Sequence, residues 1–185
     1  MREDDMIEME IEDVLVRVSV VDSSRLAWFG RIVILKEKEG NRALPIWTGP
    51  PEGDLLFMCL REASTPRPMP HDLMADLIGV LGGRVERIAI TEQSDLGYHA
   101  TISLAVDGRT EDVDARPTDA LLLAARTEKP MLAAEQILDR EGVSADTLSE
   151  KLPPRDVETA VMAPGEWRSL SVDLLRSLHH PPTQG

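Results

Sequence analysis

Acidic and basic side chains gather in one short segment of the chain, residues 111–119. Asp112 and Asp114 alternate along a predicted strand, so both carboxylates should lie on one face, with their Cα atoms about 6.5–7 Å apart. At that spacing they could share one hydrated Mg²⁺ or Mn²⁺. Arg116 adds a planar guanidinium suited to phosphate, and Asp119 follows at a helix start. These four residues form the first candidate catalytic site, with Asp112 and Asp114 as metal ligands.

The same residues also have a purely structural interpretation. An aspartate in the first turn of a helix, such as Asp119, is stabilised by the helix dipole and by free backbone N–H groups. The guanidinium of Arg116 could simply pair with one of its acidic neighbours. From the sequence alone, both interpretations remain open.

His71 and Asp72, which follow Pro70, form a second candidate catalytic pair. An imidazole can act as a general base or as a metal ligand. The alternative is that Asp72 caps a helix that starts at Pro70, with His71 in a loop. His99 lies beside Tyr98 in a predicted strand, and a packing or surface role is predicted for both.

Several familiar catalytic motifs are absent from the sequence. It contains no Gly-x-Ser-x-Gly, no phosphate-binding loop ending in Gly-Lys-Ser/Thr and no His-Glu-x-x-His. One cysteine and four scattered histidines give no zinc-binding spacing. The sequence therefore argues against a serine hydrolase, a P-loop nucleotidase and a zinc protease.

The charge of the chain limits how it could bind nucleic acid. The net charge is −13, and residues 1–13 hold seven acids against one base. Residues 1–10 are predicted to be a flexible acidic arm. Broad, salt-driven binding of nucleic acid needs a clustered basic face, which this balance does not favour. A local basic cleft is still compatible with it.

Cysteine usage and hydropathy suggest a compartment. Cys59 is the single cysteine, so no internal disulfide can form, which fits a reducing environment. No apolar run approaches the ~20 residues that span a bilayer, and the N-terminus does not resemble a signal peptide. We therefore expect a soluble, cytoplasmic protein without a membrane partner.

Hydrophobic periodicity and turn residues predict the elements that would position these side chains. The order strand-strand-strand-helix-helix occurs twice, which predicts an α+β fold with a duplicated β-β-β-α-α unit, a mixed or antiparallel sheet and helices packed on it. In the helix over 70–82, an apolar stripe (Leu73, Met74, Leu77, Ile78, Leu81) is predicted to face the core. The predicted strands are 11–22, 31–36, 42–48, 84–91, 98–106 and 111–115, and the predicted helices begin at Pro50, Pro70, Pro117 and Pro130, the last ending at Gly142.

The predicted folded domain covers residues 11–148. Residues 149–185 form a C-terminal extension in which Leu170 to Leu178 could make one amphipathic helix. Residues 1–10 and 152–185 are expected to be dispensable for folding. The helix containing residues 121–125 is apolar around most of its circumference, which predicts that the domain assembles into a homo-oligomer.

Four blocks of sequence carry a resemblance to a known family: Leu44-Pro45-Ile46-Trp47-x-Gly49, His71-Asp72-Leu73-Met74, Leu81-Gly82-Gly83-x-Val85-Glu86-x-Ile88, and Asp114-Ala115-Arg116-Pro117-Thr118-Asp119-Ala120. In order and spacing they resemble the signature blocks of bifunctional nuclease (BFN) domains. The resemblance implies an α+β fold with a duplicated unit, homo-oligomers, and the DNase and RNase activity of some members. Pro51 and Gly53 depart from the family pattern, which usually has a bulky apolar residue and an alanine there.

Two functions follow as hypotheses. The first is a metal-dependent nuclease of low sequence specificity, acting on DNA or RNA near Asp112, Asp114, Arg116 and Asp119, with His71 and Asp72 as further candidates. The second is a non-catalytic oligomeric module, regulatory or scaffolding, in which these side chains hold elements and subunits together. Convergence of the acids and His71 in one open cleft would favour the first hypothesis.

Overall fold

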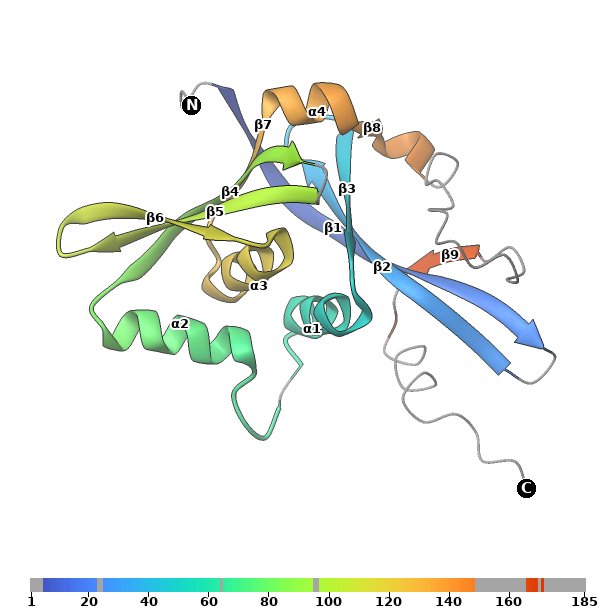
Figure 1. Cartoon of the computed structure of the whole chain (residues 1–185), viewed down its shortest axis with the longest axis horizontal. Helices are drawn as coiled ribbons and strands as arrows, with labels where there is room; N and C mark the ends of the chain where they lie inside the picture. The colour runs from blue at the N-terminus through green and yellow to red at the C-terminus, as the bar shows by residue number, and fades with distance from the viewer. Residues whose placement is uncertain are drawn as a thin grey trace.

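A single mixed sheet runs through the molecule, and helices α1, α2 and α3 lie together beside it (Figure 1). The structure is a computed structural model that describes residues 5–22, 25–63, 65–94, 97–148, 166–169 and 171. The helices are α1 (Pro50–Leu60), α2 (Pro70–Val80), α3 (Pro117–Thr127) and α4 (Glu135–Glu141). The strands are β1 (Met6–Asp22), β2 (Arg25–Glu37), β3 (Arg42–Thr48), β4 (Arg84–Ser94), β5 (Gly97–Val106), β6 (Arg109–Ala115), β7 (Met131–Ala134), β8 (Val143–Ser144) and β9 (Glu166–Ser169).

The strand order is β6-β5-β4-β7-β1-β2-β3-β8, with β9 paired to β1. Every described pairing is antiparallel except β4 with β7, which is parallel, so the sheet is mixed. A tight turn at Asp107–Gly108 joins β5 to β6, and both residues have positive φ, as this hairpin connection requires. The predicted α+β fold with a mixed sheet is confirmed.

The second half of the chain departs from the predicted duplication. Residues 131–134 form strand β7, so the predicted helix beginning at Pro130 is wrong over its first turn, and α4 starts only at Glu135. The strand lies between the edges of β4 and β1 and pairs with both. Hydrogen bonding to two otherwise unpaired edges outweighs the helical periodicity of this segment. A second β-β-β-α-α unit is therefore not confirmed.

The acidic N-terminal segment is also more ordered than predicted. Strand β1 begins at Met6, and residues 6–9 pair with β7. The prediction of a flexible arm is wrong for residues 6–10. Pairing with β7 fixes a segment that composition alone assigns to solvent.

Helix α3 forms the centre of the core. Its residues 121–124 are almost fully buried between α1, α2 and the sheet. The apolar circumference that suggested an oligomer is thus covered by the chain itself. On α2 the predicted core stripe divides: Met74 and Ile78 pack on the core, whereas Leu73 and Leu77 are 53% and 52% exposed.

The C-terminal extension contributes one described strand. Strand β9 pairs with residues 15–18 of β1, so this part of the extension joins the sheet. The predicted helix from Leu170 to Leu178 lies outside the described residues. Within the described part of the chain, no helix combines the length and apolarity that a membrane span requires.

Candidate functional site

The N-terminal end of α3 holds part of the first candidate site. Arg116 precedes Pro117, which starts the helix without needing its missing N–H. The guanidinium donates to both carboxylate oxygens of Asp119, at 2.7 and 3.0 Å, and lies 3.5 Å from Glu52 of α1. Donating these hydrogen bonds to Asp119 raises the pKa of Arg116, whose side chain is 66% exposed. This arrangement matches the structural interpretation, in which Arg116 pairs with a neighbouring acid.

The two predicted metal ligands lie on β6, an edge strand. Asp112 accepts a hydrogen bond from the hydroxyl of Ser103 at 2.7 Å. The side chain of Asp114 is 87% exposed and lies 3.9 Å from Nδ1 of His99. Among the described residues, no group of three or more histidine, cysteine, aspartate or glutamate side chains is arranged to hold a metal ion. Asp112 and Asp114 thus belong to no such group within the part of the chain that the structure describes.

The two candidate sites do not converge. Arg116 stands at the start of α3, and Arg126, which pairs with Asp72, stands in its last turn. Ten residues of helix separate these arginines, which places their backbones about 15 Å apart. The convergence of the acids and His71 in one open cleft, which would have favoured the nuclease hypothesis, is not seen among the described residues.

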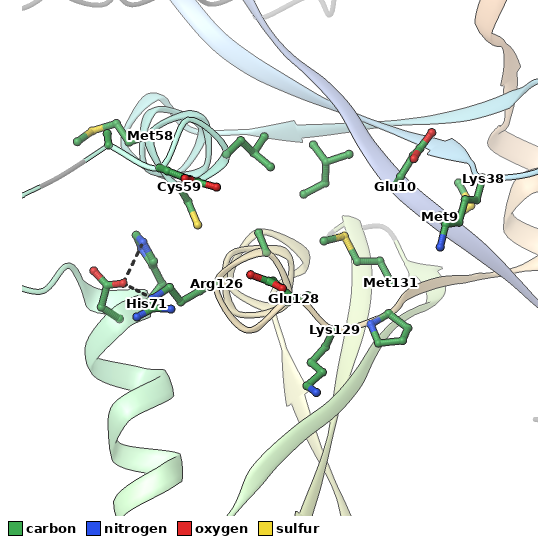
Figure 2. A pocket seen from close by; sticks show the side chains of 18 of the residues that line it. Met9, Glu10, Lys38, Met58, Cys59, His71, Arg126, Glu128, Lys129 and Met131 are labelled. Atoms are coloured by element: carbon green, nitrogen blue, oxygen red, sulfur yellow. Dashed lines mark hydrogen bonds and ion pairs between the residues drawn. The ribbon is translucent and has the colours of Figure 1, made fainter.

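A cavity of about 1000 Å³ opens at the C-terminal end of α3. Figure 2 shows His71 and Arg126 on one side, with Lys38 and Glu10 across from them. Its walls come from β1, the ends of α1 and α3, the first turn of α2 and the start of β7. The lining residues are Glu8, Met9, Glu10, Ile11, Lys38, Met58, Cys59, Leu60, Glu62, Ala63, Thr65, His71, Asp72, Ala124, Ala125, Arg126, Glu128, Lys129, Pro130 and Met131.

Asp72 holds two elements of this cavity together. Its carboxylate accepts the backbone N–H of Met69 at 2.9 Å, which confirms the predicted helix cap. It also accepts a hydrogen bond from Nε of Arg126. The Met69 N–H lowers the pKa of Asp72 most, partial burial opposes that shift, and Arg126 and His71 add to the lowering. Asp72 is therefore a carboxylate that fixes the guanidinium of Arg126 at the cavity.

His71 is the least satisfied polar side chain at this end of α3. It belongs to the first turn of α2 and is 5% exposed, so the alternative that placed it in a loop is wrong. Its Nδ1 is buried and has no hydrogen-bond partner among the described residues, and its Nε2 lies 4.0 Å from Asp72. Buried imidazole nitrogens are normally hydrogen-bonded, so this one requires an explanation. A ligand in the cavity would provide one.

Sequence reasoning missed Arg126, Lys129 and Cys59, which also line the cavity. No local motif marks them, because α1 and α3 reach the cavity only through tertiary packing. Burial raises the pKa of the Cys59 thiol most, and the charge of Asp72 raises it further. The thiol is therefore kept protonated rather than activated as a nucleophile.

A buried ion pair explains one departure from the family pattern. Nε of Arg31 in β2 donates to Asp54 of α1 at 2.7 Å, and the Arg31 side chain is fully buried. A Cβ atom on Gly53 would lie 2.5 Å from Cβ and Cγ of Arg31. Glycine at this position thus makes room for the arginine that ties α1 to the sheet.

Comparisons with known proteins agree with the resemblance. A family model described as the bifunctional nuclease domain matches residues 33–146. An uncharacterized protein of Mycobacterium tuberculosis is 31% identical over 112 residues, which are 60% of this chain and 66% of that protein. Bifunctional nuclease 1 of Oryza sativa subsp. japonica is 27% identical over 115 residues, 60% of this chain and 35% of its own. Bifunctional nuclease 2 of Arabidopsis thaliana is 24% identical over 131 residues, 67% of this chain and 40% of its own.

Proposed function

Because the chain belongs to the bifunctional nuclease domain family, we propose that it hydrolyses phosphodiester bonds of DNA or RNA with low sequence specificity. The proposed site is the cavity at the C-terminal end of α3. The observation that carries the proposal is His71, a buried imidazole with an unpartnered nitrogen, beside the Asp72–Arg126 pair. Family membership supports the reaction class, and this constellation supports the location.

Each side chain has a definite role in the proposed reaction. Neutral His71 accepts a proton from a water molecule, whose oxygen forms the new bond to phosphorus. The bond from phosphorus to one ester oxygen breaks, and the leaving oxygen takes up a proton, returned by His71 or by solvent. Arg126 and Lys129 neutralise charge that grows on the other phosphate oxygens. Asp72 is a positioning residue, since it fixes the guanidinium of Arg126.

A divalent cation remains part of the proposal without a protein site of its own. Mg²⁺ or Mn²⁺ stabilises negative charge on phosphate when it is bound. Asp112 and Asp114 do not fit such a cation well. Asp112 accepts a hydrogen bond from the Ser103 hydroxyl, and Asp114 is a solvent-exposed side chain of an edge strand. No step is therefore assigned to a metal, and cation dependence is left to measurement.

The test compares matched histidines. Single-stranded DNA, RNA and a dinucleoside monophosphate are offered with Mg²⁺, with Mn²⁺ and with EDTA. His71→Asn should lower the hydrolysis rate at least ~100-fold, the usual contribution of a general base. His99→Asn should change it less than about twofold, because His99 lies outside the cavity lining. Both variants are first checked for unchanged melting.

The rival location is tested in the same series. If the folded Asp112→Asn/Asp114→Asn double variant loses activity while His71→Asn retains it, the chemistry belongs to the β6 edge. Loss in both His71→Asn and the double variant would contradict a cavity site that acts alone. The comparison between variants also guards against a contaminating nuclease, since a contaminant would not follow the substitutions.

The non-catalytic module remains a second candidate because α2 carries an exposed apolar stripe. Leu73, Leu77, Val80 and Leu81 are between 52% and 84% exposed. Single domains seldom expose so many neighbouring large apolar side chains. We propose that this stripe contributes to a cytoplasmic homo-oligomer, and sedimentation equilibrium should then give a mass above 20.5 kDa. A monomer at micromolar concentration would remove this candidate.

A further inference from the structure

The charges around the cavity divide into a paired group and an unpaired group. Lys38 is paired with Glu8, and Arg126 is paired with Asp72. Five acidic residues line the cavity against three basic residues. Glu10, Glu62 and Glu128 have no ion-pair partner among the described residues, and Lys129 is the lining cation without one. The rim of the cavity is therefore negative, although the guanidinium of Arg126 shares Asp72 with His71.

Two of these unpaired acids occupy backbone positions that rarely carry a glutamate. Glu62 just after α1 and Glu128 at the end of α3 have φ of 49° and 54°. Glycine or asparagine is the usual residue in this left-handed conformation, and another side chain is disfavoured there. Asp107 is the remaining non-glycine residue with positive φ among those described, and it lies in a hairpin turn. Both glutamates thus sit at fixed turn positions on the cavity rim.

A negative rim disfavours a long nucleic-acid strand. Each strand of a duplex carries one phosphate per ~3.4 Å of helix axis, and a long strand, paired or single, that crosses the cavity would bring several phosphates past the rim glutamates. Proteins that hold single strands usually combine a basic groove with aromatic side chains that stack on bases. The described lining residues include no phenylalanine, tyrosine or tryptophan.

The interior of the cavity suits a small substrate instead. Met9, Met58 and Met131 offer an adaptable apolar wall for nucleobases. The volume of about 1000 Å³ lies at the upper end of the ~300–1,000 Å³ typical of small-molecule pockets. One phosphodiester group would bring a single negative charge into a cavity whose lining includes Arg126 and Lys129, without flanking phosphates.

Resting on the proposed function, we infer that the substrates of this site are very short oligonucleotides of dinucleotide size, and that the rim acids Glu10, Glu62 and Glu128 select against longer strands. Water adds across one phosphorus–oxygen ester bond of the dinucleotide. The products are one nucleoside and one nucleoside monophosphate, with no further reactant.

The first measurement is kcat/KM per scissile bond on the full chain for a dinucleoside monophosphate, a short oligomer and a strand of about 25 nucleotides. The dinucleotide should be preferred at least ~tenfold. Its KM should change little with salt, because few counterions are released when one phosphate binds. A kcat/KM that rises steadily with strand length would overturn the inference while leaving the proposed function intact.

The second measurement changes the rim. The triple variant Glu10→Gln/Glu62→Gln/Glu128→Gln should raise kcat/KM on the long strand at least ~fivefold. Its kcat/KM on the dinucleotide should stay within about twofold of the wild-type value. The matched control Asp5→Asn/Glu92→Gln/Asp107→Asn removes as many charges from exposed acids outside the cavity lining. This control should change kcat/KM on the long strand less than about twofold. Equal gains in both variants would show a general charge effect and overturn the rim's role.

Binding keeps the inference testable if no substrate is cleaved. Equilibrium dialysis with a non-hydrolysable phosphorothioate dinucleotide and with a phosphorothioate strand gives the two dissociation constants directly. Tighter binding of the dinucleotide, lost on filling the cavity with Ala125→Phe, would support the inference while the proposed hydrolysis fails. Tighter binding of the long strand, or of neither probe, would overturn it.

Discussion

The two ends of helix α3 carry the same chemical pair in different surroundings. At the start of the helix, the guanidinium of Arg116 donates two hydrogen bonds to the carboxylate of Asp119 on an exposed surface. In the last turn, Arg126 pairs with Asp72 from another helix, next to buried His71 and a cavity. The first pair joins residues three apart, whereas the second joins residues 54 apart. The first pair stabilises a local helix start, and the second joins elements that meet only in the fold, at the cavity of the proposed site.

This difference shows what an arginine–aspartate pair can and cannot indicate. Both guanidinium groups are held by a carboxylate, and both arginines have a raised pKa because of that hydrogen bond. What distinguishes the C-terminal end is the adjacent imidazole, whose nitrogen is unsatisfied. An arginine–aspartate pair therefore indicates only that opposite charges attract. A buried polar group that lacks a hydrogen-bond partner beside a cavity indicates a ligand.

The largest effect that separates the two ends should be catalytic. Arg126→Ala removes a donor to the reacting phosphate and should lower kcat/KM about 100-fold, in the range found for one such donor. Arg116→Ala should lower it less than about threefold, since this side chain lies ~15 Å away along the helix. The measurement is initial-rate hydrolysis of a dinucleoside monophosphate. Equal losses in the two variants would mean that the ends act together and would break the comparison.

A smaller effect should follow from loosening Arg126 without removing it. Asp72→Asn keeps an oxygen for the Met69 N–H but weakens the bond to Arg126, so kcat/KM should fall about tenfold, mainly through kcat. Asp72→Glu should restore part of the loss because it returns the charge. Asp119→Asn is the matched substitution at the other end, and its kcat/KM should stay within about twofold of the wild-type value. An Asp72→Asn enzyme as active as the wild type would remove the positioning role of Asp72.

Local signals in the sequence predicted most elements and failed where distant edges meet. Proline at a helix start depends on neighbouring residues, and that prediction is confirmed at Pro50, Pro70 and Pro117. Strand β7 depends instead on hydrogen bonds to β4 and β1, which lie far away in the sequence. Its four residues have no strand-specific pattern of their own, so periodicity favoured a helix.

The candidate site divides in the same way. His71 and Asp72 are adjacent in sequence and stood out as chemically able residues, and both line the cavity. Arg126 has no neighbour that marks it, because its partner is 54 residues earlier. The cluster of Asp112, Asp114, Arg116 and Asp119 was conspicuous because its members are close in sequence. In the fold, β6 exposes its acids and α3 uses Asp119 to hold Arg116.

The acid sensitivity of the C-terminal end gives a third and smaller effect. The pKa of Asp72 is lowered in the folded state, chiefly by the Met69 N–H. The stability that this group contributes is therefore present above its unfolded pKa of about 3.9 and is lost as the pH falls through the lower folded value. Asp72→Asn should reduce the melting temperature at pH 6 and flatten its decline below about pH 4. Parallel melting curves for wild type and variant across this window would contradict the linkage.

The smallest effect concerns the N-terminal pair itself, and it tests whether that end is only a local helix start. Arg116 is largely exposed, so solvent screens its interaction with Asp119. A double-mutant cycle of Arg116→Ala and Asp119→Ala, measured by urea unfolding, should give a coupling of roughly 0.2–1 kcal/mol. Raising the salt towards ~1 M should reduce that coupling, because the Debye length shrinks to about 3 Å. A coupling above about 2 kcal/mol that resists salt would mean that Glu52 and the start of α1 make this end a structural anchor. The N-terminal end of α3 would then be a rigid structural anchor, and the C-terminal end would still be the proposed catalytic site.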